Sequence, residues 1–319
     1  MKKYVFLFAL LFLPMTAQLV SCGSGTTPAG LVNTYSATST PTSTPTPSVK
    51  LLATTPPTAN GLTLDNNGNL YVALNTGNAI EEITSAGVTS TLLTIGQPND
   101  VAYSGSNWFM TTLEPTPYVT EFSGGVTTNF PYYPASESGV AVNSTGTTIA
   151  AAYSNTSSGI AFYVFSAGTW VSRGAWYANP GTSLAAGPQA LAFDNSGDLF
   201  VALSSPSIVI EYLPGINPNP VTIAGLTGAG FANGPAATAQ FNTLAGIAVD
   251  SRGDIYVTDS GNNAIREISG GQVTTLVGTT LQNALVTTTS LSSPQGIAVS
   301  PSGNVYFTGN STSIYEYIP

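Results

Sequence analysis

The chain has 319 residues, of which 42% are apolar and only 7% are charged, whereas roughly a quarter of an average globular domain is charged. Six Lys and Arg stand against 15 Asp and Glu, and there is no His. Nucleic acid is therefore not an expected partner, because phosphate binding needs clustered Lys and Arg. The length would allow two average domains, but a repetitive all-β chain of this size is commonly one domain.

The amino terminus has the pattern of an export signal. Lys2 and Lys3 give it a positive start, residues 4–13 are apolar but too short to span a bilayer as a mature helix, and Leu-Val-Ser-Cys follows at 19–22. This motif resembles the lipobox of bacterial lipoproteins. The resemblance implies that Cys22, the only cysteine, becomes the first mature residue and carries a lipid anchor. The alternative is an ordinary secretory signal whose cleavage site includes a cysteine.

Residues 1–21 are thus expected to be a lipoprotein signal peptide, and residues 22–48 a lipidated cysteine with a linker rich in Ser, Thr and Pro. The linker has too little apolar surface to fold, and its prolines favour an extended backbone. The mature chain would keep 4 basic and 15 acidic residues, a net charge of −11. We expect an exported protein, lipid-anchored to a bacterial cell membrane, at the outer membrane or cell surface.

Residues 49–319 contain a recurring unit of short β-strands. Six first strands begin at intervals of 39 to 56 residues, at Gly61, Asp100, Gly139, Ala190, Gly246 and Gly296. After a tight turn each is followed by a second strand, at 70–72, 108–110, 148–150, 199–201, 255–257 and 305–307. Repeats of this length, with four strands each, are typical of a β-propeller.

The best-formed copy lies in residues 221–268 and contains VTIAG, GAGFANGPAATAQF and GIAVDSRGDIYVTDSGNNAIREI, followed by TTLVG. It resembles the NHL repeat, a family named for an Asn-His-Leu motif, and the resemblance covers residues 49–319 as six copies. It implies an all-β, six-bladed propeller of four-stranded antiparallel blades. Where the family has its Asn-His pair, this chain has Asn262 and Asn263, so His-dependent chemistry of relatives has no counterpart.

The last copy ends after its third strand, and residues 49–54 form a spare strand ahead of the first copy. Pairing residues 49–54 with residues 313–318 would close the ring and remove an exposed sheet edge. We therefore predict that the N-terminal strand supplies the outer strand of the sixth blade.

Several turns between first and second strands carry Asp, Asn and Gly in the manner of calcium loops, at 65–69, 194–198 and 250–254. None has the length or the distal Glu of an EF-hand. Asp or Asn can bond its own backbone in such a turn while Gly supplies a positive φ, so we interpret all three as hairpin turns. No metal site and no cofactor is predicted, and calcium is the one ion that these residue types would favour.

The third strands carry a glutamate at one equivalent position in five copies, with Val164 in the remaining one: Glu82, Glu121, Glu211, Glu267 and Glu316. Repetition around a ring usually reflects packing or solubility, and carboxylates on exposed strands are normally solvated, so packing or solubility is the first interpretation. The alternative is an acidic outer belt that binds cations or a basic surface.

Function stays open between a binding module, a calcium-dependent enzyme and a structural spacer. Six-bladed relatives include lactonases and lyases that use His or clustered acids around a central metal. Such acids should enter the central channel from the starts of the first strands, where only Asp100 offers a carboxylate. Because catalytic groups must converge, we expect a cell-envelope lipoprotein that binds a protein or glycan partner, with no catalytic residue. The alternative is a lactonase-like or lyase-like calcium enzyme.

One rim of such a propeller holds the connections between second and third strands and those between blades. On this long-loop rim lie long, non-repeating segments, whereas the opposite hairpin rim has short, similar turns. Long loops on a rigid scaffold commonly carry recognition. We predict that a monomer binds its protein or glycan partner there through Glu114, Tyr153, Asn155, Tyr177, Asn179, Asn262 and Asn263.

Overall fold

The computed structural model describes residues 46–55, 58–113, 118–130, 136–154, 158–176, 187–213, 217–278, 291–310 and 312–319. The predicted signal peptide and most of the predicted linker lie outside these residues, as do Cys22, Glu114, Asn155, Tyr177 and Asn179. Residues 45–319 form one compact unit. Within its described part the helical segment is η1 (Ser260–Asn262), and no described helix has the length and apolar character needed to cross a membrane.

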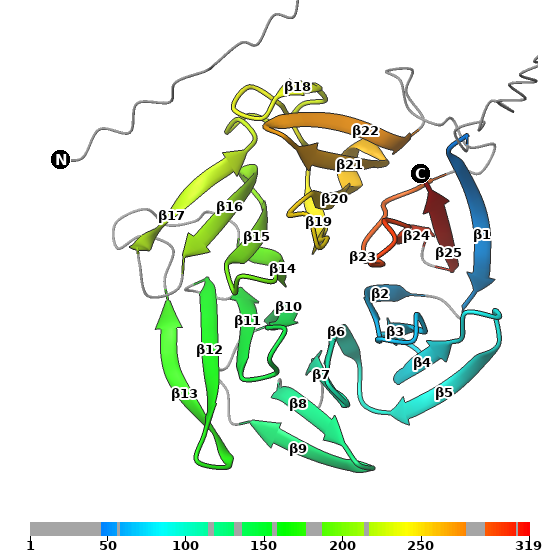
Figure 1. The fold of residues 1–319 in the computed structure, drawn as a ribbon, viewed down its shortest axis with the longest axis vertical. Coiled ribbons are helices and arrows are strands. Elements are labelled where there is room, and N and C mark those ends of the chain that lie inside the picture. Colours follow the sequence, from blue (N-terminus) through cyan, green and yellow to red (C-terminus); the bar gives the residue numbers. More distant parts are fainter. Residues whose placement is uncertain are drawn as a thin grey trace, which may run out of the picture. The chain divides into compact units, whose positions relative to one another are not determined.

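Six antiparallel sheets surround a common axis, and in four of them the strands run outward in chain order (Figure 1). Blade 1 holds β2 (Ala59–Leu64), β3 (Leu70–Leu74), β4 (Ala79–Ile83) and β5 (Thr89–Thr94). Blade 2 holds β6 (Pro98–Ser104), β7 (Asn107–Thr112), β8 (Tyr118–Ser123) and β9 (Val126–Phe130). Blade 3 holds β10 (Ser136–Val142), β11 (Thr148–Ser154), β12 (Gly159–Ser166) and β13 (Thr169–Trp176).

The second half of the ring repeats this plan with one addition. Blade 4 holds β14 (Pro188–Phe193), β15 (Leu199–Ser204), β16 (Ser207–Leu213) and β17 (Asn217–Ala224). Blade 5 holds β19 (Leu244–Val249), β20 (Ile255–Asp259), β21 (Ala264–Ser269) and β22 (Gln272–Gly278), and the short β18 (Gly234–Pro235) pairs with β22 as a fifth strand. Blade 6 holds β23 (Ile297–Val299), β24 (Val305–Asn310) and β25 (Ser313–Ile318).

The outer strand of blade 6 is β1 (Ser48–Thr54), as predicted. It runs antiparallel to β25, with Ser48 opposite Ile318 and Thr54 opposite Ser313. The Lys50 ammonium also lies 2.6 Å from the Glu316 carboxylate across this pair. The two ends of the domain thus close the ring, and the first and last strands shield each other's edges.

The core lies between blades rather than within any one of them. In one cluster Phe200 of blade 4 packs with Phe241, Ile247 and Val257 around blade 5, all less than 9% exposed. In another, Tyr71 of blade 1 packs with Met110 of blade 2. A single four-stranded blade would leave these faces in water, so each blade depends on its neighbours for burial.

The innermost strands approach one another so closely that a side chain is excluded at several points. A Cβ added to Gly246 would overlap the carbonyl oxygen of Gln295, and a Cβ added to Gly296 would overlap that of Asn60. Each contact joins one blade to the next around the axis. The equivalent positions in the other four blades are Gly61, Asp100, Gly139 and Ala190.

Replacing one of these glycines should weaken the ring. We expect Gly246→Ala to lower the free energy of unfolding by about 1–3 kcal/mol, because the new methyl group must displace the backbone of blade 6. Urea unfolding followed by far-UV circular dichroism measures the change. Gly228→Ala is the matched control, since a Cβ there has no neighbour within 4 Å. Equal losses in both variants would contradict the close-approach explanation.

Candidate functional site

A cavity of about 320 Å³ occupies the centre of the ring. All six inner strands, β2, β6, β10, β14, β19 and β23, contribute residues to its wall (Figure 1). Each of them is the edge strand of its sheet, so backbone N–H and C=O groups along its inner side have no partner within that sheet. The wall therefore offers polar backbone groups as well as side chains.

Four carboxamides surround the mouth of this channel at one equivalent position, immediately before the close-approach residue of the inner strand. We name this set the amide ring, and it consists of Asn60, Asn99, Gln189 and Gln295, all of which line the cavity. Blade 5 has Ala245 there, and blade 3 has Ser138 in the sequence. The position lies where the inner strands begin, which is the long-loop rim.

The amides of the ring are held by hydrogen bonds to their surroundings. Asn60 Nδ2 donates to Asn99 Oδ1 at 2.8 Å, which joins blade 1 to blade 2. Gln295 Nε2 donates to Ser260 Oγ at 3.1 Å, and Gln189 Nε2 donates to a backbone carbonyl two residues before it at 3.2 Å. These contacts limit the rotamers of the amide-ring side chains, so these side chains lose little conformational entropy when a ligand binds.

Asp100 lines the same cavity, as its place in the sequence suggested, and is the one carboxylate among the described lining residues. Its Oδ1 accepts a hydrogen bond from the N–H of Val101 and its Oδ2 one from the N–H of Val140 in blade 3, both at 2.9 Å. On its other side it lies against Gly61 of blade 1. Burial raises the pKa of Asp100 to about 7, although the two N–H groups oppose this shift. Its contacts give Asp100 a structural role between three blades.

This raised pKa predicts that stability falls as pH rises. Below the ordinary Asp value of 3.8 the carboxyl is protonated in both states, but between about pH 4 and 7 only the unfolded chain ionises. From pH 5 to pH 8 the wild type should therefore lose about 2–3 kcal/mol more unfolding free energy than Asp100→Asn, which cannot ionise. Urea unfolding of both proteins at the two pH values gives this difference. An identical pH dependence in both would refute the assignment.

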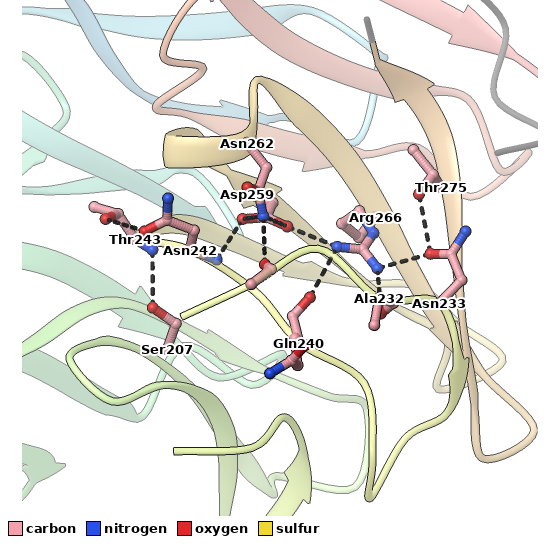
Figure 2. A network of polar contacts seen from close by, with 11 residues as sticks. Ser207, Ala232, Asn233, Gln240, Asn242, Thr243, Asp259, Asn262, Arg266 and Thr275 are labelled. Carbon is pink, nitrogen blue, oxygen red and sulfur yellow. Dashed lines mark hydrogen bonds and ion pairs between the residues drawn. The ribbon is translucent and has the colours of Figure 1, made fainter. Parts of the chain in front are cut away.

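Arg266 on β21 is fully buried and is the centre of a second polar network (Figure 2). Its Nη1 pairs with Asp259 Oδ2 at 2.6 Å, and its Nη2 donates to Ala232 O at 2.9 Å and Asn233 Oδ1 at 2.7 Å. The guanidinium also lies over the rings of Phe231 and Phe241. Arg266 thereby fixes residues 225–243, the connection from blade 4 to blade 5, against β21 and β22.

Asn262, one of the predicted binding residues, belongs to this network, and Asn263, another, follows it in the chain. Asn262 Nδ2 donates to both oxygens of Asp259 at 2.9 Å and to Gly230 O at 2.8 Å (Figure 2). Asn263 follows η1 with a φ of 52°, and its Oδ1 accepts the N–H of Ser293 at 2.8 Å. Asn263 thus holds the loop that carries Gln295 of the amide ring, whereas Asn262 holds the connection from blade 4 to blade 5. Their direct contact with a partner stays a prediction.

Tyr153, the third predicted residue that the structure describes, lies on β11 and is only 3% exposed. The expectation of an accessible aromatic ring at this position is therefore corrected. Its place within β11, which pairs with β10 on one side and β12 on the other, accounts for this burial. The structure does not bring Tyr153 together with the asparagines of blade 5.

None of the five glutamates on the third strands is fully exposed, which favours packing over solubility as the reason for their pattern. Glu82 accepts the Tyr71 hydroxyl at 3.0 Å, Glu121 accepts Trp170 Nε1 of blade 3 at 3.1 Å, and Glu316 is 5% exposed. Burial alone would raise the pKa of Glu316, but Lys50 and neighbouring hydrogen bonds lower it. In blade 1 Glu82 lies opposite Tyr71 of the second strand. In blade 3 the corresponding residue of the second strand is Ala150, and Phe162, rather than Val164, lies opposite it.

The calcium-like turns are hairpin turns, as predicted. In each, Oδ1 of the first aspartate accepts backbone N–H groups two and four residues further along: Asp65, Asp194 and Asp250. Gly68, Gly197 and Gly253 take the required positive φ, at 81°, 89° and 85°. Among the described residues no three His, Cys, Asp or Glu side chains are grouped so that they could hold a metal ion.

Sequence reasoning missed the amide ring, although a signal was present. Asn, Gln or Ser stands directly before the first strand in five of six copies, and such residues ahead of a strand are usually read as turn formers. Only the arrangement of the six blades shows that the residues at this position, which lie far apart in the sequence, line one opening.

Six blades, five of four strands and one of five, with the first and last strands paired in blade 6, define a six-bladed β-propeller. Residues 241–268 match the NHL repeat and residues 274–316 match the family described as beta-propeller repeat. The protein is therefore a six-bladed β-propeller with an NHL repeat in its fifth blade. No curated protein is similar enough to count as a relative.

Solved structures of the same fold come from proteins with different functions. They include an auxiliary nutrient binding protein from Bacteroides thetaiotaomicron, at 15% identity over 82% of this chain and 69% of that chain, with a TM-score of 0.65. A gluconolactonase from Xanthomonas campestris matches at 11% over 85% and 89%, with a TM-score of 0.62. A virginiamycin B lyase from Staphylococcus aureus matches at 12% over 86% and 100%, with a TM-score of 0.58. At these identities the likeness is one of fold.

Proposed function

We propose that this protein is a binding module of the bacterial cell envelope, anchored by lipid on Cys22, whose propeller holds an uncharged polar partner at the long-loop rim. The observation that carries the proposal is the amide ring. Carboxamides can both donate and accept hydrogen bonds without bringing charge, and here they are gathered around a cavity near the lower end of the roughly 300–1,000 Å³ range of small-ligand sites.

A calcium-dependent lactonase or lyase is less well supported. Hydrolysis or elimination needs an acid or base that can reach the substrate, and both oxygens of Asp100 already accept backbone N–H groups. The virginiamycin B lyase structure is of a catalytically inactive histidine-to-alanine variant, whereas this chain has no His. Two similar propellers are named auxiliary nutrient binding proteins, which agrees with a binding role.

The entry of the linker into the propeller also favours this arrangement. β1 is the outer strand of blade 6 and begins at Ser48, opposite Ile318 near the C-terminus. Strand polarity puts this end at the hairpin rim, since Pro319 lies 3.9 Å from the position of a Cβ on Gly303 in a hairpin turn. A tether from Cys22 would therefore join the rim opposite the amide ring and leave the channel mouth open to a partner.

Membrane attachment is tested by Cys22→Ser. The variant lacks the thiol that would carry the lipid, so we expect it to lose labelling by a fatty-acid probe and to leave the membrane fraction of the expressing bacterium. Labelling followed by fractionation and immunoblotting measures both. Unchanged partitioning would show that something other than Cys22 holds the protein at the membrane.

Binding at the long-loop rim is tested by site-specific photo-crosslinking in intact cell envelopes. A photo-reactive amino acid at position 189, in the amide ring, should capture an envelope protein or glycan. The same residue at position 196, in an exposed turn on the hairpin rim, is the matched control and should capture none. Capture from position 196 alone, or from neither position, would overturn the proposal. The predicted contacts at Glu114, Asn155, Tyr177 and Asn179 would be mapped by the same method.

A further inference from the structure

We propose that the amide ring is a binding site for the end of a neutral carbohydrate chain, with Asn60, Asn99, Gln189 and Gln295 as the groups that meet sugar hydroxyls. This inference rests on the proposed function and narrows the polar partner to one chemical class.

The charge of the cavity excludes ionic ligands. No Lys or Arg lines it among the described residues, and its one carboxylate is Asp100. A phosphate, a sulfate or a uronic acid would enter without a counter-charge and beside an acidic group, at a substantial desolvation cost. An ammonium group would meet a single carboxylate, Asp100, whose charge is already partly compensated by the N–H groups of Val101 and Val140. The ligand must therefore be neutral.

Its hydrogen bonding excludes apolar ligands. An aliphatic or aromatic group at the mouth would separate the carboxamides of Asn60, Gln189 and Gln295 from water without offering a hydrogen bond in return, which costs about 1–3 kcal/mol for each polar group that loses a partner. A sugar hydroxyl is a donor and an acceptor at once, and a carboxamide carries a matching N–H and C=O on one planar group. Four such groups facing one opening fit a ligand with several neighbouring hydroxyls.

The shape of the cavity separates a glycan from a peptide. A cavity of about 320 Å³ enclosed by six strands takes one chain end more readily than a loop, which would have to pass two chain segments through the mouth. A peptide end carries an ammonium or a carboxylate, and both are disfavoured by the charge argument. The non-reducing end of a neutral glycan enters as a single chain and brings no charge.

The ring is also prepared for binding before the ligand arrives. The Asn60–Asn99 contact is 2.8 Å and the Gln295–Ser260 contact 3.1 Å, and Ser260 Oγ in turn donates to Pro294 O at 2.7 Å. Such support fixes the direction of the amides, which sharpens selectivity among sugars that differ in one hydroxyl.

The test is isothermal titration of the soluble propeller, residues 46–319, which the structure shows as one compact unit. The probes are glucose, galactose, mannose, N-acetylglucosamine and their neutral disaccharides, with glucuronate and a short Gly-Ser peptide for comparison. At least one neutral sugar should bind saturably, and glucuronate and the peptide should not. Gln189→Met and Gln295→Met keep the side-chain length but remove its hydrogen bonds, so each should weaken binding about tenfold.

Gln272→Met is the matched control, because Gln272 is an exposed residue of the outer strand β22 and the same change there should leave binding intact. Melting temperatures of all variants show that each is folded. Sugar binding that is unaffected by Gln189→Met and Gln295→Met would put the site elsewhere and overturn the inference. Binding of glucuronate or the peptide in place of neutral sugars would also overturn it. If no sugar binds while crosslinking at position 189 still captures an envelope protein, this inference fails and the proposed function stands.

Discussion

The structure depends on how closely its six inner strands approach one another around the axis. Gly246 and Gly296 bring their backbones against the carbonyls of Gln295 and Asn60 in the next blade, and any side chain there would push the blades apart. The close contact narrows the channel and fixes the angle between blades. It also determines the site, because residues directly before these contacts, among them Asn60 and Gln295, line the cavity.

Each blade contributes one position to the mouth, so a site arises from repetition without any single blade containing it. Four of the six positions carry carboxamides, and all four line the cavity. A binding surface of this kind can be altered one blade at a time, since the strands that hold it are fixed by backbone contacts and by apolar packing between blades. Propellers of the same fold accordingly include proteins with names as different as auxiliary nutrient binding protein, gluconolactonase and virginiamycin B lyase.

Features that depend on the local sequence pattern were predictable from the sequence. Features that depend on residues brought together from distant parts of the chain were not. Alternating apolar residues and Asx-Gly turns predicted the strands, and the spare strand at residues 49–54 predicted the closure with β25. The roles of Asn262 and Asn263 were missed because a polar turn residue looks the same whether it binds Asp259 or a partner. Arg266 was also missed, since its partners at residues 232–240 are brought to it only by folding.

The distribution of charge along the axis is the strongest physical argument for a neutral ligand. The turn aspartates Asp65, Asp194 and Asp250 lie at the hairpin rim, and Tyr71 bonds both Asp65 and Glu82 near that end. In blade 4 Phe200 stands where blade 1 has this tyrosine, and burial together with the neighbouring acids raises the pKa of Glu211. At the other end Asp259 is neutralised by Arg266, and Asp100 is enclosed by backbone. Among the described residues, Asp100 is thus the one carboxylate that lines the channel, and both of its oxygens accept backbone N–H groups, so hydrogen bonding by the amides dominates the selection of a ligand.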